Sequence, residues 1–168
     1  EWEKWAVKAM RPSRGLQVLE ETGWLAHFPE VAVLRGTPQD PEWHPEGDVF
    51  THTGHCLDAL AASGAWRESD VLRRERLMFA VLAHDFGKPT TTVLAEKKGR
   101  QRWASPGHEP AGGEPAMRFL RRIGAPLRLD APVRTLVVNH LAHFSGQEEP
   151  SATAVRRLAR RLEPATIE

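Results

Sequence analysis

The chain has 168 residues, a length that suits one compact domain, and we expect residues 1–168 to fold as a single unit. Its 23 basic side chains nearly balance 22 acidic ones, so net charge alone predicts neither nucleic-acid nor membrane binding. The single cysteine, Cys56, excludes an intrachain disulfide framework and a cysteine-rich zinc site. No apolar run approaches the roughly 20 residues that span a bilayer, and we recognise no signal peptide. We therefore expect a cytoplasmic protein with no membrane partner.

Helical patterns dominate the first half of the chain. Trp2 and Trp5 lie at helical spacing, and Pro12 opens a second helix that Gly23 ends. Residues 29–48 then form a long loop with four prolines, and loops of this length in a compact domain are usually functional or mobile. A third helix follows, with an acidic N-cap at Asp48, and it ends at Gly64.

The second half continues in the same way. Ser69 caps a helix over 70–87 whose last turns are apolar nearly all round, which predicts a central, buried helix. Residues 88–107 are polar and broken, and we expect a flexible excursion there. Further helices are predicted from about Pro115, over 130–144, and after Ser151. Because neither a period-two alternation nor a repeat is evident, the predicted fold class is all-α.

Histidines are the most distinctive residues of the chain, which has eight. A lone histidine on a helix is usually a core or surface residue, but four predicted helices can each bring ligands into one bundle core. The candidates are His52, His84 with Asp85, His108 and His140. Imidazole and carboxylate donors without a thiolate indicate Mn, Fe, Co, Ni or Zn rather than a structural zinc site. Adjacent residues diverge by roughly 100° on a helix, so His84 and Asp85 share a metal most easily where Gly87 ends it.

These segments also resemble a known family. "THTGHCLDAL" followed by "LAHDFGKPTT" resembles the HD superfamily of metal-dependent phosphohydrolases. Together with "RPSRGLQVLEETGWLAHFPEV", "WHPEGDVFTHT", "GHEPAG" and "VVNHLAHF", the chain over about residues 10–145 is similar to the HD domain of bacterial CCA-adding enzymes, the tRNA nucleotidyltransferases. The resemblance implies an all-α HD-domain helical bundle with its metal site between central helices. It also implies hydrolysis of phosphate esters, including 2′,3′-cyclic phosphates and 2′-nucleotides.

The family's site residues can be carried over one at a time. His52 matches the first histidine, and His84 with Asp85 matches the His-Asp doublet. His108 matches the histidine of the Gly-His-Glu element, and His140 a later histidine. Many HD proteins also use a late aspartate, which this chain lacks, because its last aspartate, Asp130, precedes His140. We expect His140 to take that place, with His143 in reserve. The implied cofactor is one or two ions of Mn, Ni, Co, Fe or Zn, with Mg also compatible.

The resemblance assigns the chemistry to a few residues. A metal on His52, His84 and Asp85 lowers the pKa of a bound water for attack on phosphorus, and His108 with His140 can hold a second ion. Asp85 is thus a catalytic candidate. Lys88 is both a catalytic and a substrate-binding candidate, since it can neutralise a phosphate oxygen, although a solvated loop lysine is equally consistent.

Residues outside the metal cluster can bind the substrate. Arg156 and Arg160, with Arg157 and Arg161, line one helix face that can follow an RNA backbone, or can simply be solvated. Trp43 and Trp103, in the two polar loops, can stack a base or anchor their loops. His55 is either a second-layer residue beside His52 or a surface residue.

The leading hypothesis is a metal-dependent phosphodiesterase or phosphatase acting on nucleotide or RNA 3′-end phosphate esters. The family implies tRNA as a partner and a nucleotidyltransferase head in the parent chain. The head's glycine-rich and paired-aspartate elements have no match here. Because the chain starts at Glu1, we expect either a piece excised from a longer protein or trimmed ends. The alternatives are a non-catalytic helical body that binds RNA, such as tRNA, and a metal-stabilised structural domain.

Overall fold

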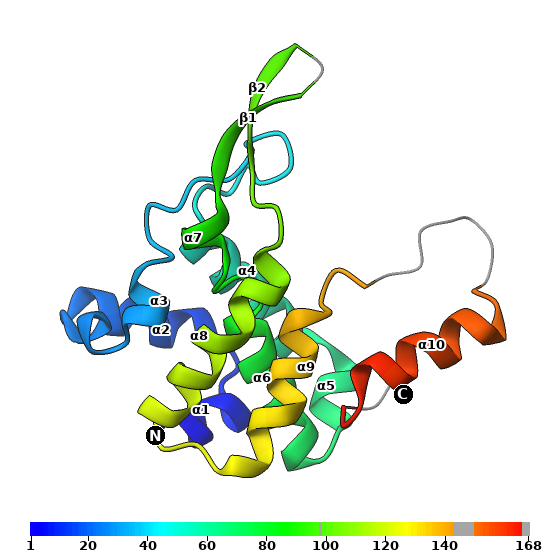
Figure 1. Cartoon of the computed structure of the whole chain (residues 1–168). Coiled ribbons are helices and arrows are strands. Elements are labelled where there is room, and N and C mark those ends of the chain that lie inside the picture. The colour runs from blue at the N-terminus through cyan, green and yellow to red at the C-terminus, as the bar shows by residue number, and fades with distance from the viewer. Residues whose placement is uncertain (98, 143–149, 166–168) are drawn as a thin grey trace.

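The computed structural model describes residues 1–97, 99–142 and 150–165, and over these the chain is a helical bundle with one short hairpin (Figure 1). The all-α prediction is confirmed. In chain order the elements are α1 (Trp2–Lys8), α2 (Pro12–Glu21), the 3₁₀ helix η1 (Trp24–His27), α3 (Pro29–Ala32), α4 (Val49–Ala62), α5 (Gly64–Glu68), α6 (Val71–Ala83), α7 (Lys88–Thr91), β1 (Val93–Lys97), β2 (Arg100–Ala104), α8 (His108–Arg122), the 3₁₀ helix η2 (Leu127–Leu129), α9 (Asp130–Val138) and α10 (Ala152–Leu162).

Helix α6 is the centre of the bundle, as its apolar sequence predicts. It packs against α1, α4, α8 and α9, and Met78, Phe79 and Leu82 are almost fully buried. Phe79 contacts the ring of Phe119 from α8, with the two ring centroids 6.4 Å apart. Burial of these side chains stabilises the fold by about 1.5–3 kcal/mol each, and it fixes the end of α6 against the neighbouring helices.

The helix boundaries differ from the predictions in two places near α6. Asp70, rather than Ser69, is the N-cap of α6, because its carboxylate accepts a hydrogen bond from Arg73 N. Ser69 instead ends α5, and its hydroxyl donates to Trp66 O. Other caps are confirmed: Asp48 accepts from Thr51 N at the start of α4, as predicted.

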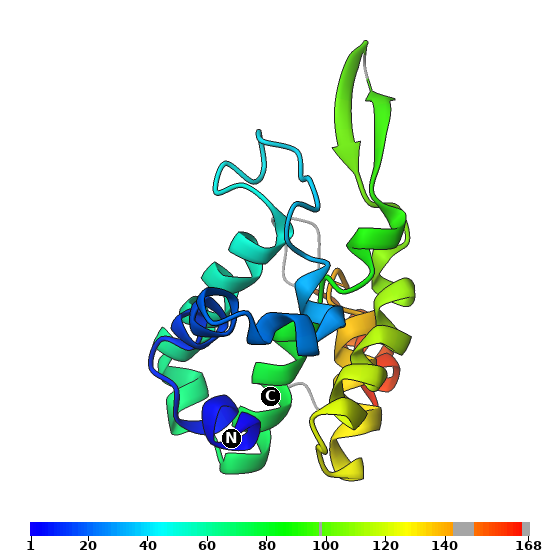
Figure 2. The same ribbon diagram turned by 90° about the vertical axis from the view of Figure 1, so that its left-hand side faces the viewer.

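The segment after α6 is more regular than the sequence suggested. The expected irregular stretch over 88–107 contains the antiparallel pair β1–β2, in which Leu94 lies opposite Trp103. Gly99, at the turn, has φ 72°, which glycine adopts without strain. The hairpin rises from the same end of the bundle as the loop over 37–48 (Figures 1 and 2). Helix α8 begins at His108 rather than near Pro115, because Pro110 lies in its first turn, where no backbone donor is needed.

The last helix lies at the side of the bundle. Ser151 caps α10, as predicted, and α10 packs against α9. The reserve ligand His143 lies outside the described residues. Over the described part of the chain, no helix is both long and apolar enough to cross a membrane.

Candidate metal centre

Asp85 is the centre of a cluster of polar side chains at the hairpin end of the bundle. It follows α6 directly, in the turn 84–87, and is 1 % exposed. Helices α4, α6, α8 and α9 all begin or end near this point, so each contributes one histidine. The contributed residues are His52 in the first turn of α4, His84 at the end of α6, His108 at the start of α8 and His140 just after α9.

The Nε2 atoms of these four histidines all lie within 4.0 Å of the Asp85 carboxylate. His108 and His140 approach Oδ1, at 3.4 and 4.0 Å. His84 and His52 approach Oδ2, at 3.1 and 3.9 Å. The carboxylate therefore lies between two pairs of imidazoles, with one oxygen facing each pair. The five residues that the sequence singled out as ligands are brought together, which by itself does not show that a metal binds.

The opposite ring nitrogen of each histidine has its own partner. Nδ1 of His84 lies 2.7 Å from Val81 O, Nδ1 of His108 lies 2.7 Å from Ser105 O, and Nδ1 of His140 lies 2.7 Å from Val137 O. A carbonyl oxygen only accepts, so each Nδ1 must carry the proton and donate it. This arrangement leaves Nε2 of each ring directed at the cluster, which is the atom that a metal-binding histidine held in this way offers to an ion.

His52 is oriented by a carboxylate instead of a carbonyl. Its Nδ1 lies 2.6 Å from Oε1 of Glu46, which also lies 3.1 Å from Nδ1 of His44. Burial opposes ionisation of Glu46, but its own backbone N–H and the two imidazoles outweigh that effect and lower its pKa to about 2. Burial also lowers the pKa of His52 and that of His140, which favours neutral rings at both positions.

The Asp85 carboxylate lacks a regular hydrogen-bond partner. Both of its oxygens are buried, and neither accepts a hydrogen bond from the part of the chain that the structure describes. Nζ of Lys88 lies 2.8 Å from Oδ2, close enough for an ion pair but without hydrogen-bond geometry. Although burial favours the neutral acid, His84 and Lys88 keep the pKa of Asp85 well below its usual range. A buried, ionised carboxylate requires a cation, and Lys88 supplies one beside Oδ2, whereas Oδ1 faces the imidazoles of His108 and His140.

The donor set fits a divalent transition metal. Nε2 of His108 and Nε2 of His140 are 3.1 Å apart, and both are lone-pair acceptors when Nδ1 holds the proton. Two unprotonated nitrogens at this distance repel each other, and one cation bound by both would remove the repulsion, since nitrogen–metal distances of about 2.1 Å are compatible with the separation. Asp85, His108 and His140 thus form one group whose donor atoms lie within 4.8 Å of one another.

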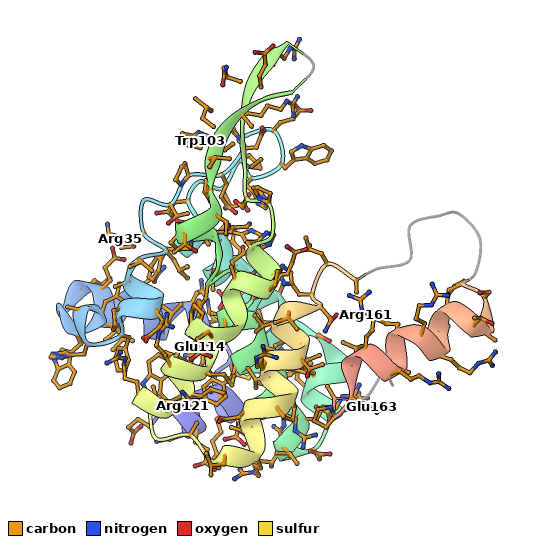
Figure 3. The ribbon with its side chains drawn as sticks, viewed as in Figure 1. Arg35, Trp103, Glu114, Arg121, Arg161 and Glu163 are labelled. Carbon is orange, nitrogen blue, oxygen red and sulfur yellow. The ribbon has the colours of Figure 1, made fainter. Side chains whose placement is uncertain are left out.

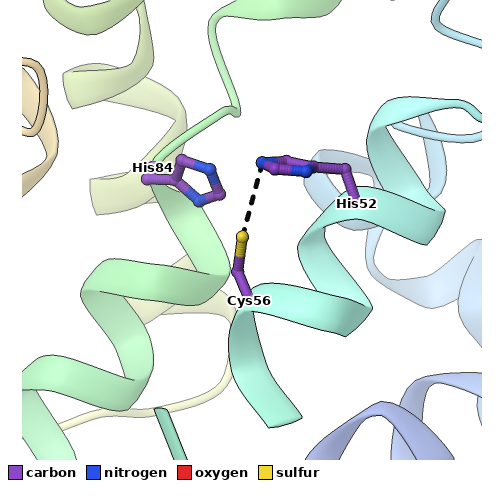
Figure 4. Close-up of side chains that lie close together, drawn as sticks. All are labelled: His52, Cys56 and His84. Carbon is purple, nitrogen blue, oxygen red and sulfur yellow. Dashed lines mark hydrogen bonds between the residues drawn. The ribbon is translucent and has the colours of Figure 1, made fainter. Parts of the chain in front are cut away.

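A second group includes a residue that the sequence interpretation left out. His52, Cys56 and His84 form another set with donor atoms within 4.8 Å, and Figure 4 shows the three side chains pointing toward one another. Sγ of Cys56 lies 3.4 Å from Nε2 of His52. Burial, together with Asp85 and Glu46, raises the pKa of the Cys56 thiol. The i, i+4 spacing of His52 and Cys56 on one helix was a signal that could have identified it.

Lys88 lies beside the cluster rather than in a solvated loop. Its ammonium group donates a 2.7 Å hydrogen bond to Oε1 of Gln39, and the residue is 9 % exposed. The same side chain lines a small cavity of about 190 Å³ together with His44 and His108. Lys88 therefore presents a positive charge at the point where this cavity meets the histidine cluster.

Gly87 sets how closely the His-Asp turn approaches α8. A Cβ atom at this position would lie 2.1 Å from His108 O and 2.7 Å from Gly112 N. The sequence interpretation gave Gly87 a different role, as the residue that ends a helix and frees Asp85. In the structure α6 already ends at Ala83, and the backbone of Gly87 is in the right-handed helical region. The physical reason for glycine is thus the close contact of two backbones.

Other candidates lie away from this cluster. Arg156 and Arg160 are on α10, where Arg156 donates a hydrogen bond to Thr153 of the same helix. Arg161 is the arginine of α10 that reaches toward the site, donating to Oδ1 of Asn139, the neighbour of His140 (Figure 3). The RNA-binding role of Arg156 and Arg160 stays a prediction. His55 is exposed, in agreement with its interpretation as a surface residue.

Curated proteins similar to this chain share one name, "Multifunctional CCA protein". The protein from Halorhodospira halophila is 44 % identical over 128 residues, covering 74 % of this chain and 28 % of that protein. Those from Cupriavidus taiwanensis and Pasteurella multocida are 35 % and 31 % identical, covering 96 % and 94 % of this chain and 36 % of each protein. The chain thus spans about a third of the length of these relatives. No family model and no solved structure matches it.

Proposed function

We propose that this chain, which belongs with the multifunctional CCA proteins and spans about a third of their length, is an HD-type metal-dependent phosphohydrolase domain. The proposed substrates are phosphate esters of nucleotides or RNA 3′ ends, such as 2′,3′-cyclic phosphates. The observation that carries the proposal is the buried Asp85 carboxylate, which accepts no regular hydrogen bond from the described residues and faces the Nε2 atoms of four histidines.

The metal ligands proposed are His52, His84, Asp85, His108 and His140. Because each oxygen of Asp85 faces a different pair of histidines, the carboxylate can serve two ions as well as one. Mn, Ni, Co, Fe and Zn suit imidazole and carboxylate donors, and Cys56 adds a softer donor on one side. A bound divalent ion supplies Lewis acidity that activates water and neutralises charge on a phosphate ester.

Residues of the chain itself orient the four histidine rings and supply a positive charge for the phosphate. The Nδ1–H groups stay bound to carbonyl or carboxylate acceptors, so the rings cannot turn away from Asp85. Lys88, held by Gln39, offers a cation to a non-bridging phosphate oxygen. In hydrolysis of a cyclic phosphate, the oxygen of water bonds to phosphorus and one ribose ester P–O bond breaks. The released ribose oxygen takes up a proton, which leaves a phosphomonoester.

Product analysis tests this proposal. We expect the chain supplied with Mn²⁺, Ni²⁺ or Co²⁺ to convert 2′,3′-cyclic AMP to a monoester, observed by ³¹P nuclear magnetic resonance. Later release of inorganic phosphate would add a phosphatase activity. The variant His140→Ala should lose turnover, whereas His55→Ala on the exposed face of α4 should keep it. Absence of hydrolysis with all three metals would contradict the proposal.

A second candidate function is a non-catalytic body that binds tRNA or another RNA. The observation in its favour is α10, whose four arginines share one helix face. In that case RNA binding would weaken steeply with salt and would decrease in Arg156→Ala and Arg160→Ala. Mutation of Asp85 would leave the binding unchanged. The two functions are compatible in a longer parent chain, in which a nucleotidyltransferase domain would share the tRNA.

A further inference from the structure

Two cavities lie in succession between the metal cluster and the tip of the hairpin. The inner one, of about 190 Å³, is bordered by Lys88 and His108. The outer one, of about 710 Å³, is bordered by β1, β2 and the loop before α4. The two cavities adjoin, because both are lined by Trp43, Trp103, Asp40 and Ala104. Pockets for small ligands typically have volumes of roughly 300–1,000 Å³.

The outer cavity has walls that are held in place by an ion-pair network. Arg102 of β2 pairs with Asp40, at 3.8 Å, and forms a short contact with Glu42 from the loop. Asp40 also accepts a hydrogen bond from Glu42 N, and its carbonyl oxygen accepts from Trp43 N. These ion pairs therefore hold the hairpin against the loop, and Trp43 follows directly after Glu42 in that loop.

The two tryptophans are available to a ligand. The exposed fraction is 72 % for Trp43 and 37 % for Trp103, which is high for indole side chains. Within the described chain, neither ring contacts another aromatic ring, whereas Trp2 and Trp5 pack together in the core. Figure 3 shows Trp103 on the hairpin, above the bundle. Exposed indoles that line cavities next to a phosphate site are suited to stacking on a nucleobase.

The charged side chains that line the outer cavity favour a nucleobase over a phosphate backbone as its ligand. Asp40, Glu42 and Glu96 give it three acidic side chains, and of its two arginines Arg102 is already paired with two of them. A groove that tracks an RNA backbone is positively charged. This cavity would repel a second phosphate, but its acids and exposed rings can accept the amino groups and the face of a base.

We propose that the cavity lined by Trp43 and Trp103 binds the nucleobase of the nucleoside whose phosphate ester lies at the Asp85 cluster. This inference rests on the proposed function for the position of the phosphate. It assigns the substrate class as nucleotides or RNA 3′-terminal nucleosides, in preference to phosphate esters without a base. Stacking on an aromatic ring contributes enough binding energy for a roughly 5-fold to 150-fold effect on affinity.

Calorimetric binding of 2′-AMP and of ribose 2-phosphate, both with Mn²⁺ present, tests the inference without requiring turnover. We expect Trp43→Ala and Trp103→Ala to weaken 2′-AMP binding by roughly 5-fold to 150-fold and to leave ribose 2-phosphate binding unchanged. Trp43→Phe should restore most of the affinity. Trp24→Ala is the matched control, because Trp24 is 60 % exposed but lies on η1, outside both cavities.

The outcomes separate this inference from the proposed function. Equal affinity of the wild-type chain for the two ligands, or equal losses for both in the tryptophan variants, would overturn the inference. Failure to bind 2′-AMP would overturn it as well. Base-dependent binding that requires Trp43, in a chain that hydrolyses nothing, would support the nucleobase site and contradict the hydrolase. Turnover of 2′,3′-cyclic AMP that is unchanged in both tryptophan variants would support the hydrolase and contradict the nucleobase site.

Discussion

Substitution of Gly87 by alanine should disrupt both the fold and the metal cluster. The added Cβ would lie 2.1 Å from His108 O, 2.7 Å from Gly112 N and 2.9 Å from His108 C. These are all backbone atoms, so no side-chain rotation can relieve the contact. Overpacking typically costs about 1–3 kcal/mol, and a backbone clash belongs at or above the upper end of that range. For a chain of this size, about 3 kcal/mol corresponds to a decrease in Tm of roughly 6–12 °C.

Urea and thermal unfolding, followed by circular dichroism, would measure the effect of Gly87→Ala. The start of α8 should also shift, and because His108 is its first residue, affinity for Mn²⁺ should fall together with stability. Gly64→Ala is the control: no atom lies within 4 Å of its Cβ position, at the first residue of α5. That variant should be neutral or stabilised by up to about 1 kcal/mol. Wild-type stability and metal affinity in Gly87→Ala would refute the close approach of the His-Asp turn to α8.

Three further predictions concern the surroundings of the cluster. Asp48→Ala should cost about 2 kcal/mol of unfolding free energy, because Asp48 caps α4 and also accepts a hydrogen bond from Gly36 N. Asp70→Ala, which removes the cap of α6, should cost about 1 kcal/mol, and equal losses in urea unfolding would contradict this. Folding lowers the pKa of Glu46 from 4.5 to about 2. The ionised Glu46 carboxylate therefore stabilises the folded state fully above about pH 4.5, and this contribution is lost as the pH falls toward 2. The difference in unfolding free energy between wild type and Glu46→Gln should therefore shrink from about pH 5 downward, and a constant difference would argue against an ionised Glu46 carboxylate beside His52. Calorimetry should show Mn²⁺ binding at least about 10-fold weaker in His52→Ala and unchanged in His55→Ala, three residues along the same helix, and equal affinities would exclude His52 as a ligand.

The central helix could be predicted because its signal is local: an apolar surface all round identifies a buried helix. Its ends were less certain, since the cap is Asp70 instead of the predicted Ser69 and the helix ends at Ala83 instead of Gly87. The hairpin was missed because its strands have five residues each and do not alternate cleanly between apolar and polar side chains. The start of α8 was placed too late, because prolines were taken as breaks although one of them lies in the first turn.

For the site, the sequence predicted which histidines gather but not how they are oriented. The split of the four rings between the two oxygens of Asp85 depends on where α4, α8 and α9 meet, which has no local signal. Glu46 lies in a long loop without periodicity, so the sequence left open that it reaches the site but gave no signal for its contact with His52. Gly87 illustrates the same limit, since the close contact that requires glycine is with a helix more than 20 residues later in the chain.

The most direct test of the central claim is a Mn²⁺ titration of the metal-stripped chain, with turnover of 2′,3′-cyclic AMP as the readout. The same titration of Asp85→Asn supplies the comparison, because asparagine has the same shape but no negative charge. We predict turnover that rises with bound Mn²⁺ in the wild-type chain and is absent in Asp85→Asn, whose circular dichroism spectrum should match that of the wild type. No turnover at any Mn²⁺ concentration, or equal turnover in the two chains, would contradict a metal-dependent hydrolase centred on Asp85.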